Sequence, residues 1–161
     1  MDLAEERHRV RDLMQQREVA MLLTFGGGEA HAGRPMLPLW LPEDPNIYFL
    51  THGKSRKVAQ VNERPQVAVT VINAGCYLVV LGLAHASQDP ALIRRLWRPS
   101  YRAWFPEGSD DREATVLRMV IHKVSYWEPP PWSRVRRLFQ AVTAAVTRQP
   151  VETPMKTIDT W

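Results

Sequence analysis

Three cationic side chains and a serine are adjacent in the segment THGKSRKV, residues 51–58: Lys54, Ser55, Arg56 and Lys57. An apolar run ends just before this segment and an amphipathic stretch follows it, so we expect a helix to begin here. A helix start has unpaired N–H groups and a positive partial charge, which makes it unfavourable for cations unless an anion binds there. Arg56 and Lys57 would then donate charge-assisted hydrogen bonds to a phosphate, and Ser55 would cap the helix. A solvated basic helix face explains the same residues equally well, and residue types alone do not decide between the two.

The Gly-Lys-Ser letters of this segment also occur in the phosphate-binding loops of nucleoside triphosphatases. That motif requires a glycine five positions before Gly53, and this chain has Tyr48 there. The sequence therefore argues against a nucleoside triphosphatase, while leaving a more general anion site open.

A further cation, Arg34, lies in the segment HAGRPMLPLW, residues 31–40. An arginine on a strand is ordinary by itself. If this segment pairs antiparallel with NIYFLT, residues 46–51, Arg34 lies near Thr51 and the helix start. Two cationic elements would then meet at one place.

Four aromatic side chains gather in the segment LWRPSYRAWFPEG, residues 96–108: Trp97, Tyr101, Trp104 and Phe105. Packing in the core or in a dimer interface is the commoner role of such a block. The alternative is a wall for a planar cofactor or substrate, because aromatic side chains with a few polar groups typically line small-molecule pockets.

The remaining composition argues against several classes of protein. The net charge of +4 comes from 21 basic and 17 acidic residues, which is too mixed for a dedicated nucleic-acid-binding protein. The single cysteine, Cys76, cannot form a disulfide within the chain, and the longest apolar stretch is far below the ~20 residues of a membrane span. The charged amino terminus lacks the apolar segment of a signal peptide, so we expect a cytoplasmic protein. We expect no metal site, because no ligand spacing is found among the histidines His8, His31, His52, His85 and His122.

The elements that position these residues follow from hydrophobic periodicity and turn residues. Six strands are predicted over residues 18–25, 31–41, 47–51, 65–72, 76–87 and 114–128, with Gly82 as a bulge or a point of close approach. Helices are predicted near residues 3–14, 56–62, 89–97 and 132–147. Strands in hairpin order without βαβ alternation favour an antiparallel barrel of the α+β class. We expect one domain over residues 1–148, followed by a loose tail, residues 149–161.

The motifs GRPM, IYFLTHGKSRKV, NERPQVAVTV and YLVVLGLAHA, in this order, resemble the pyridoxamine 5′-phosphate oxidase-like flavoproteins of the FMN-binding split-barrel fold. The segments LWRPSYRAWFPEGSDD and VSYWEPP are similar to the general stress protein 26 branch, and the resemblance spans residues 5–147. It implies a mainly β fold, a six-stranded antiparallel split β-barrel with N- and C-terminal helices, and a homodimer with two FMN molecules at its interface. An FMN-dependent oxidoreductase of unknown substrate is therefore the leading hypothesis, and the sequence indicates no catalytic side chain.

The resemblance also implies roles for particular residues. The FMN phosphate would be held by Arg34 and by Ser55, Arg56 and Lys57. The rest of the cofactor would be contacted by Pro35, Met36, Leu50, Thr51, Tyr77, Trp97 and Trp104.

The chain differs from the family pattern at two places, and two alternative hypotheses for its function stay open. The oxidases have a lysine, and stress relatives often a glutamine, where this chain has Leu39, and the closing oxidase segment with its arginine and histidine has no match. We therefore do not expect a true pyridoxamine phosphate oxidase. Within the same fold, the pocket could instead hold the deazaflavin F420 or haem. From another class, a non-enzymatic basic module could use SRVRRLF, residues 133–139, against nucleic acid or a membrane.

Overall fold

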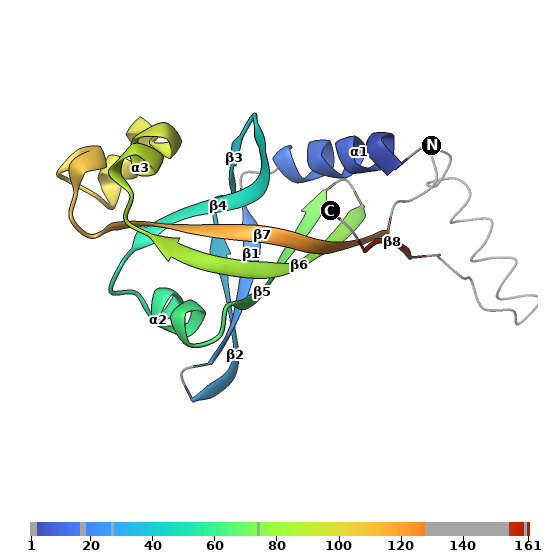
Figure 1. Cartoon of the computed structure of the whole chain (residues 1–161), viewed down its shortest axis with the longest axis horizontal. Coiled ribbons are helices and arrows are strands. Elements are labelled where there is room, and N and C mark those ends of the chain that lie inside the picture. The colour runs from blue at the N-terminus through green and yellow to red at the C-terminus, as the bar shows by residue number, and fades with distance from the viewer. Residues whose placement is uncertain (1–2, 17–18, 27, 74, 128–154, 160) are drawn as a thin grey trace, which may run out of the picture.

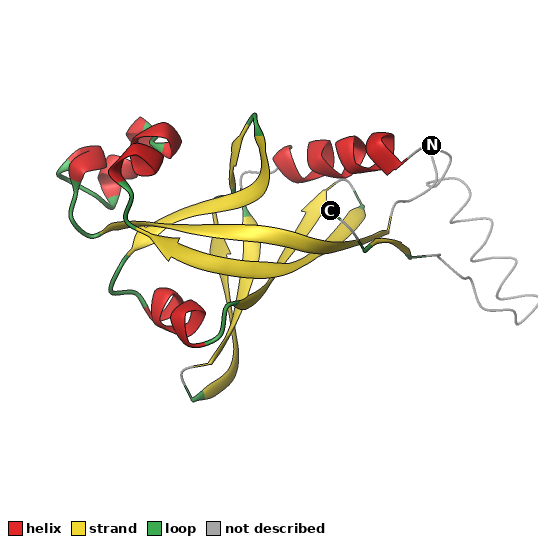
Figure 2. Ribbon diagram, in the orientation of Figure 1, coloured by secondary structure: helices red, strands yellow, loops and turns green. Residues whose placement is uncertain are grey.

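The computed structural model describes residues 3–16, 19–26, 28–73, 75–127, 155–159 and 161. Within these residues one antiparallel sheet of eight strands curls into a half-open barrel, with helices packed at its ends (Figure 1 and Figure 2). The order across the sheet is β2-β1-β5-β6-β7-β4-β3, and β8 pairs with β7. The strands are β1 (Ala20–Gly26), β2 (Glu29–Met36), β3 (Leu39–Leu41), β4 (Asp44–His52), β5 (Gln66–Asn73), β6 (Cys76–Ser87), β7 (Ala114–Trp127) and β8 (Lys156–Ile158).

The described helices lie at the two ends of the long strands β6 and β7. Helices α2 (Arg56–Glu63) and α3 (Pro90–Leu96) lie toward one end, together with the 3₁₀ turns η1 (Pro99–Ala103) and η2 (Gly108–Asp110) (Figure 1). Helix α1 (Leu3–Gln15) lies toward the other end, where the Tyr126 hydroxyl of β7 donates to Glu6 over 2.5 Å. The antiparallel α+β barrel predicted from hairpin order and the split-barrel fold implied by the resemblance are confirmed.

The predicted strand 31–41 is in fact two strands with different partners. Pro38 has no N–H for a ladder, and the chain changes partner there: β2 pairs with β1, and β3 pairs with β4. The predicted pairing of this segment with β4 near Arg34 is therefore wrong, because Arg34 lies opposite Leu22 of β1. This division is one reason why the sheet has more than the predicted six strands.

The other additional strand, β8, falls in the segment that we expected to be loose. Ile158 lies opposite Val124 of β7 and is 2% exposed, and the Trp161 indole donates to the Pro45 carbonyl over 3.3 Å. Burial of Ile158 and partial burial of Trp161 against the larger core hold this part of the tail against the barrel. The predicted helix 132–147 and residues 149–154 lie outside the described residues.

Two clusters of buried apolar side chains fill the described part of the fold. The larger cluster fills the barrel interior and includes Phe49, Leu78 and Met119. The smaller cluster joins β3 and β4 to α3 and η1, and its members include Leu50, Tyr101 and Phe105. This second cluster holds the aromatic segment against the end of β4.

Gly82 shows why one position of β6 accepts no side chain. The pairing of β6 with β7 shifts register between Leu81 and Gly82, and a Cβ built on Gly82 would lie 2.1 Å from the Val120 carbonyl oxygen. Contact with a backbone atom at this distance cannot be relieved by a side-chain rotation. The predicted bulge and close approach at Gly82 are confirmed.

We therefore expect Gly82→Ala to destabilise the protein by about 3 kcal/mol, which corresponds to a loss of roughly 6 to 12 °C in melting temperature. Differential scanning calorimetry measures this loss. The matched control is Gly33→Ala, whose Cβ would meet only Met21 Cε at 3.8 Å and Leu23 Cγ at 3.9 Å. Equal melting temperatures for the two variants would show that the strands separate at Gly82 without cost.

Candidate functional site

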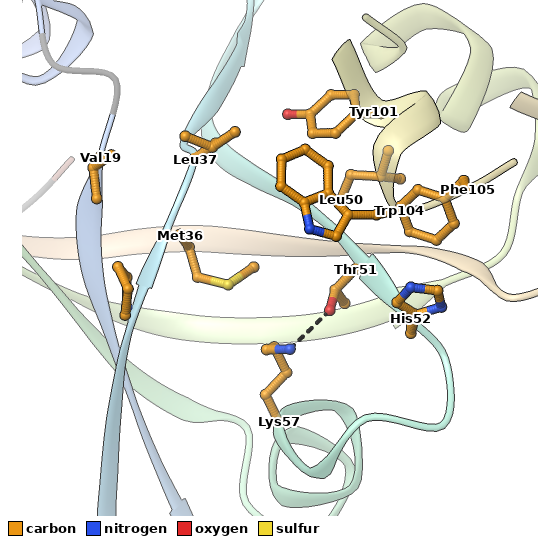
Figure 3. Close-up of a pocket in the computed structure, with 11 residues that line it drawn as sticks. Val19, Met36, Leu37, Leu50, Thr51, His52, Lys57, Tyr101, Trp104 and Phe105 are labelled. Carbon is orange, nitrogen blue, oxygen red and sulfur yellow. Dashed lines mark hydrogen bonds between the residues drawn. The ribbon is translucent and has the colours of Figure 1, made fainter. Parts of the chain in front are cut away.

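A pocket of about 280 Å³ opens at the end of the barrel where α2 and the aromatic segment approach β4. Figure 3 shows Lys57 at one end of it, and Tyr101 with Leu37 toward the other. The predicted site residues Pro35, Met36, Leu50, Thr51, Lys57 and Trp104 line it. The pocket is also lined by Tyr101 and Phe105, which the sequence indicated only as members of the aromatic block, and by Val19, Leu37 and His52, which sequence reasoning missed.

The cationic end of the pocket is built around Lys57. Its Nζ atom donates to Thr51 Oγ1 over 3.0 Å (Figure 3). Burial, together with the positive charge of Arg34, lowers the pKa of Lys57 below its ordinary value. Burial and then the charge of Arg56 likewise lower the pKa of Arg34. The three cations therefore lie close enough to repel one another, and an anion placed among them would relieve that repulsion.

Arg34 reaches this place through contacts that its strand pairing does not reveal. Its guanidinium donates from Nη1 to Thr24 Oγ1 over 2.8 Å and from Nη2 to Gln60 Oε1 over 3.0 Å. The Thr24 hydroxyl in turn donates to Gln60 Oε1 over 2.6 Å, and Gln60 Nε2 donates to the Gly26 carbonyl over 3.3 Å. Thr24 and Gln60 are buried, so this network fixes α2 against the β1–β2 hairpin and holds Arg34 beside the start of α2.

The start of α2 has an unused capping residue. Ser55 occupies the N-cap position with extended backbone angles, but its side chain makes no cap hydrogen bond. Its Oγ atom is buried and has no hydrogen-bond partner among the described residues. A cap serine ordinarily bonds to an N–H of the first turn, and a buried hydroxyl without a partner is costly. The hydroxyl, the first N–H groups of α2 and the nearby cations together suit a phosphate group.

Lys54, the remaining cation of this segment, does not belong to the cluster. Its Nζ atom pairs with Glu113 Oε1 at 2.6 Å on the surface. Gly53 lies close to Thr115 and Gln88, where a Cβ would meet the Thr115 hydroxyl at 2.7 Å. The turn before α2 is therefore fixed against the residues just before β7, by a hydrogen bond of 2.8 Å from the Gly53 N–H to the Glu113 carbonyl, and Lys57 lines the pocket.

The aromatic segment forms one wall of the pocket. Some of its side chains pack in the core, and others line the pocket. Tyr101 and Phe105 are buried, and Trp97 packs behind them, with ring centroids 5.9 Å from Tyr101 and 6.2 Å from Phe105. Trp104 is 55% exposed and faces the pocket (Figure 3). The His52 ring stacks on Phe105 with centroids 4.5 Å apart. The structure places Trp97 in the supporting core and Trp104 at the pocket.

Tyr77 does not line this pocket in the same chain. It lies near the beginning of β6, opposite Ile72 of β5 and Trp127 of β7. Ser87, at the other end of β6, is in register with Val116, which pairs with Leu50 of the pocket. Tyr77 is therefore remote from Leu50 but not from the Val19 side of the pocket, because its partner Ile72 lies two residues from Thr70, which pairs with Met21. Tyr77 is 51% exposed and lines no part of this chain's own pocket.

In the part of the chain that the structure describes, no group of three or more His, Cys, Asp or Glu side chains is arranged to hold a metal ion. No helix there is long and apolar enough to cross a bilayer. The basic segment 133–139 lies outside the described residues.

Comparison with known proteins gives a family and a fold. Residues 5–152 match the family described as pyridoxamine 5′-phosphate oxidase like. The general stress protein 26 of Bacillus anthracis has a similar structure, with a TM-score of 0.67, 20% identity, and coverage of 76% of this chain and 93% of that one. The general stress FMN/FAD binding protein of Xanthomonas citri has a TM-score of 0.67 and 23% identity, with coverage of 77% and 89%.

A pyridoxamine 5′-phosphate oxidase-related, FMN binding protein of Nostoc punctiforme is also similar, with a TM-score of 0.58, 15% identity, and coverage of 80% and 87%. At these identities the structural matches establish a shared fold. No curated protein matches the chain.

Proposed function

Because the chain belongs to the pyridoxamine 5′-phosphate oxidase-like family, we propose that it is a flavoprotein that binds FMN in the pocket between α2 and the aromatic segment. The observation that carries the proposal is the cation cluster at one end of that pocket: Lys57 lines the pocket and interacts electrostatically with Arg34, and the unpartnered Ser55 hydroxyl is at the N-cap of the same helix. The rest of the pocket, next to this cation cluster, is lined by apolar and aromatic side chains. A flavin mononucleotide combines a phosphate and a planar ring in one molecule, so it suits both parts.

The side chains then divide into those that bind the phosphate and those that face the ring system. Lys57, Ser55 and Arg34 would hold the phosphate, with Arg56 adding charge at the helix start. Met36, Leu50 and Trp104 would provide apolar surface for the ring and exclude water from it. Bound flavin supplies the electron transfer, and the protein positions it and sets its electronic environment. We propose an FMN-dependent oxidoreductase in this sense.

We further propose that a second copy of this chain closes the pocket. The outer face of β1, β5 and β6 exposes a row of apolar side chains, here called the apolar face: Val19, Met21, Ile72, Tyr77 and Leu81. Ile72 is 64% exposed and is the cross-strand neighbour of Tyr77. Contiguous exposed apolar side chains of this kind mark interaction surfaces.

The apolar face is continuous with the pocket, because Val19 belongs to both. A homodimer formed through this face would bury it and place FMN at the interface. Tyr77, which lines no part of its own chain's pocket, would contact a flavin across such an interface.

The position expected to distinguish an oxidase is apolar here. Leu39 is 2% exposed and belongs to the smaller core cluster, so it presents no polar group to a ligand. This supports an activity other than oxidation of pyridoxamine phosphate. The test of the proposal is a titration of the purified protein with FMN, F420 and haem in parallel, followed by absorbance and fluorescence. FMN should bind most tightly, and preference for either of the other two would replace FMN with the alternative cofactor.

A further inference from the structure

The Tyr101 hydroxyl is a buried polar group that the proposed roles leave unexplained. Tyr101 is 4% exposed, and its OH atom has no hydrogen-bond partner among the described residues. Burying a hydroxyl without a partner costs free energy, and such groups in native proteins call for an explanation. Phenylalanine would fill the same space in the smaller core cluster without this cost.

The position of Tyr101 suggests what its hydroxyl serves. Tyr101 lines the pocket, and Figure 3 shows it at the end away from Lys57, with Leu37 and Trp104 beside it. The side chains between the two ends are largely apolar, among them Met36 and Leu50. The pocket thus has a cationic end, an apolar middle and a single hydroxyl at its far end.

This hydroxyl is suited to donate a hydrogen bond to an uncharged acceptor. Burial raises the pKa of Tyr101 above its ordinary value, and the smaller opposing effect of Arg98 does not reverse this. The hydroxyl therefore keeps its proton at neutral pH, and its natural partner is a carbonyl oxygen or an unprotonated ring nitrogen.

We propose that Tyr101 donates a hydrogen bond to the carbonyl-bearing pyrimidine edge of the flavin ring, and so fixes which edge of the ring enters the aromatic end of the pocket. The inference rests on the proposed FMN function. The two ends of the three-ring system differ in chemistry: the dimethylbenzene end has no acceptor, whereas the pyrimidine end has two carbonyl groups. Only the second orientation satisfies the hydroxyl, and the opposite one leaves it buried and unpaired.

Access to the hydroxyl involves Trp104. The Trp104 and Tyr101 ring centroids are 6.3 Å apart, and Trp104 is the more exposed of the two aromatic side chains. An exposed side chain changes rotamer at low cost, whereas Tyr101 is fixed by the core cluster on its other side. A ring entering the pocket can therefore displace the indole and reach the hydroxyl.

The test compares Tyr101→Phe with the wild-type full-length protein, using FMN and riboflavin as the two ligands. Loss of one hydrogen bond at the ring should raise the dissociation constants of both flavins by about tenfold. Lys57→Met should weaken FMN alone, because riboflavin has no phosphate. Flavin fluorescence quenching measures the six affinities of the three proteins for the two flavins, and the pattern assigns each residue to one end of the ligand.

A second measurement separates a ligand-binding hydroxyl from a structural one. Without flavin, Tyr101→Phe should not lower the melting temperature, because the hydroxyl it removes has no partner. The matched control, Tyr126→Phe, removes a hydroxyl that donates to Glu6, and should lower the melting temperature by roughly 2 to 4 °C.

The outcomes separate failure of the Tyr101 contact from failure of flavin binding itself. If the wild-type protein binds FMN, and Tyr101→Phe binds FMN and riboflavin with the wild-type affinities, the hydroxyl does not contact the ring and this inference is wrong. A Tyr101→Phe variant as unstable as Tyr126→Phe would also overturn it, since the hydroxyl would then have a structural partner. If the wild-type protein binds neither flavin, the proposed function itself fails.

Discussion

Lys57→Met should weaken FMN binding by about 100-fold, because a buried charge-assisted hydrogen bond to phosphate contributes about 1.5 to 3 kcal/mol and its loss leaves the phosphate beside fewer cations. Methionine preserves most of the apolar stem, so the substitution removes charge with little change in volume. Isothermal titration with FMN at constant ionic strength measures the effect. Combining it with Arg34→Ala should eliminate measurable binding.

Two control variants make this result specific to position and charge. Lys54→Met removes a cation from the same turn, but one that is exposed and paired with Glu113, so FMN affinity should stay unchanged. Lys57→Arg retains the charge and should retain most of the affinity. Equal weakening by the substitutions at Lys54 and Lys57 would point to a general electrostatic attraction instead of a phosphate site.

The lowered pKa of Lys57 also gives the affinity a pH dependence of defined sign. Its charged form is the one that binds phosphate, so FMN affinity should fall as the pH rises through this lowered pKa, which lies below 10.5. Lys57→Arg should show no such fall in this range, because arginine stays protonated.

The same pKa has a consequence for the unliganded protein. The unfolded chain, with the ordinary lysine pKa, holds the proton more tightly than the folded chain does, so a charged Lys57 disfavours folding at neutral pH. Unliganded Lys57→Met should therefore melt no lower than the wild-type protein. Thermal scans without FMN provide the measurement, and a lower melting temperature would mean that the contact with Thr51 outweighs the repulsion.

Ile72→Glu should convert a homodimer into monomers and release FMN, because the carboxylate would be placed in the middle of the apolar face. Burying an unpaired charge is far more costly than exposing it, so association should weaken by at least 100-fold. Light scattering coupled to size exclusion measures the mass, and absorbance of the same peak reports the flavin.

The control for this variant is Thr157→Glu, which adds the same carboxylate at an exposed position of β8, outside the apolar face. It should remain dimeric and retain FMN. A wild-type protein that elutes as a monomer with FMN bound would show that the pocket is complete in one chain, and the role proposed for Tyr77 would fall with the dimer.

Local sequence signals predicted much of this fold, and their limits are physical. Alternating apolar residues and glycine turns correctly predicted the strand that became β6 and the close approach at Gly82. They could not reveal that Pro38 divides one predicted strand, because a proline either interrupts a strand or sits at its edge. Ile158 was missed for a related reason: one apolar residue in a polar tail has no periodicity to detect.

The candidate site was predictable only where its residues are adjacent in the chain. Ser55, Arg56 and Lys57 lie in one turn, and their conflict with the helix start was visible in the sequence. The approach of Arg34 was expected for a wrong reason, since it depends on Gln60 and on the packing of α2 against β1. A buried glutamine on a helix face gives no sign of its distant partner, so this network required the three-dimensional structure.

The most direct test of the central claim is an FMN titration of the purified, flavin-free full-length protein, monitored by visible absorbance and by flavin fluorescence. We expect saturable binding with one FMN per chain, a perturbed flavin absorbance band and quenched fluorescence, all strongly weakened in Lys57→Met. A spectrum identical to that of free FMN at every protein concentration, with unquenched fluorescence, would contradict the account.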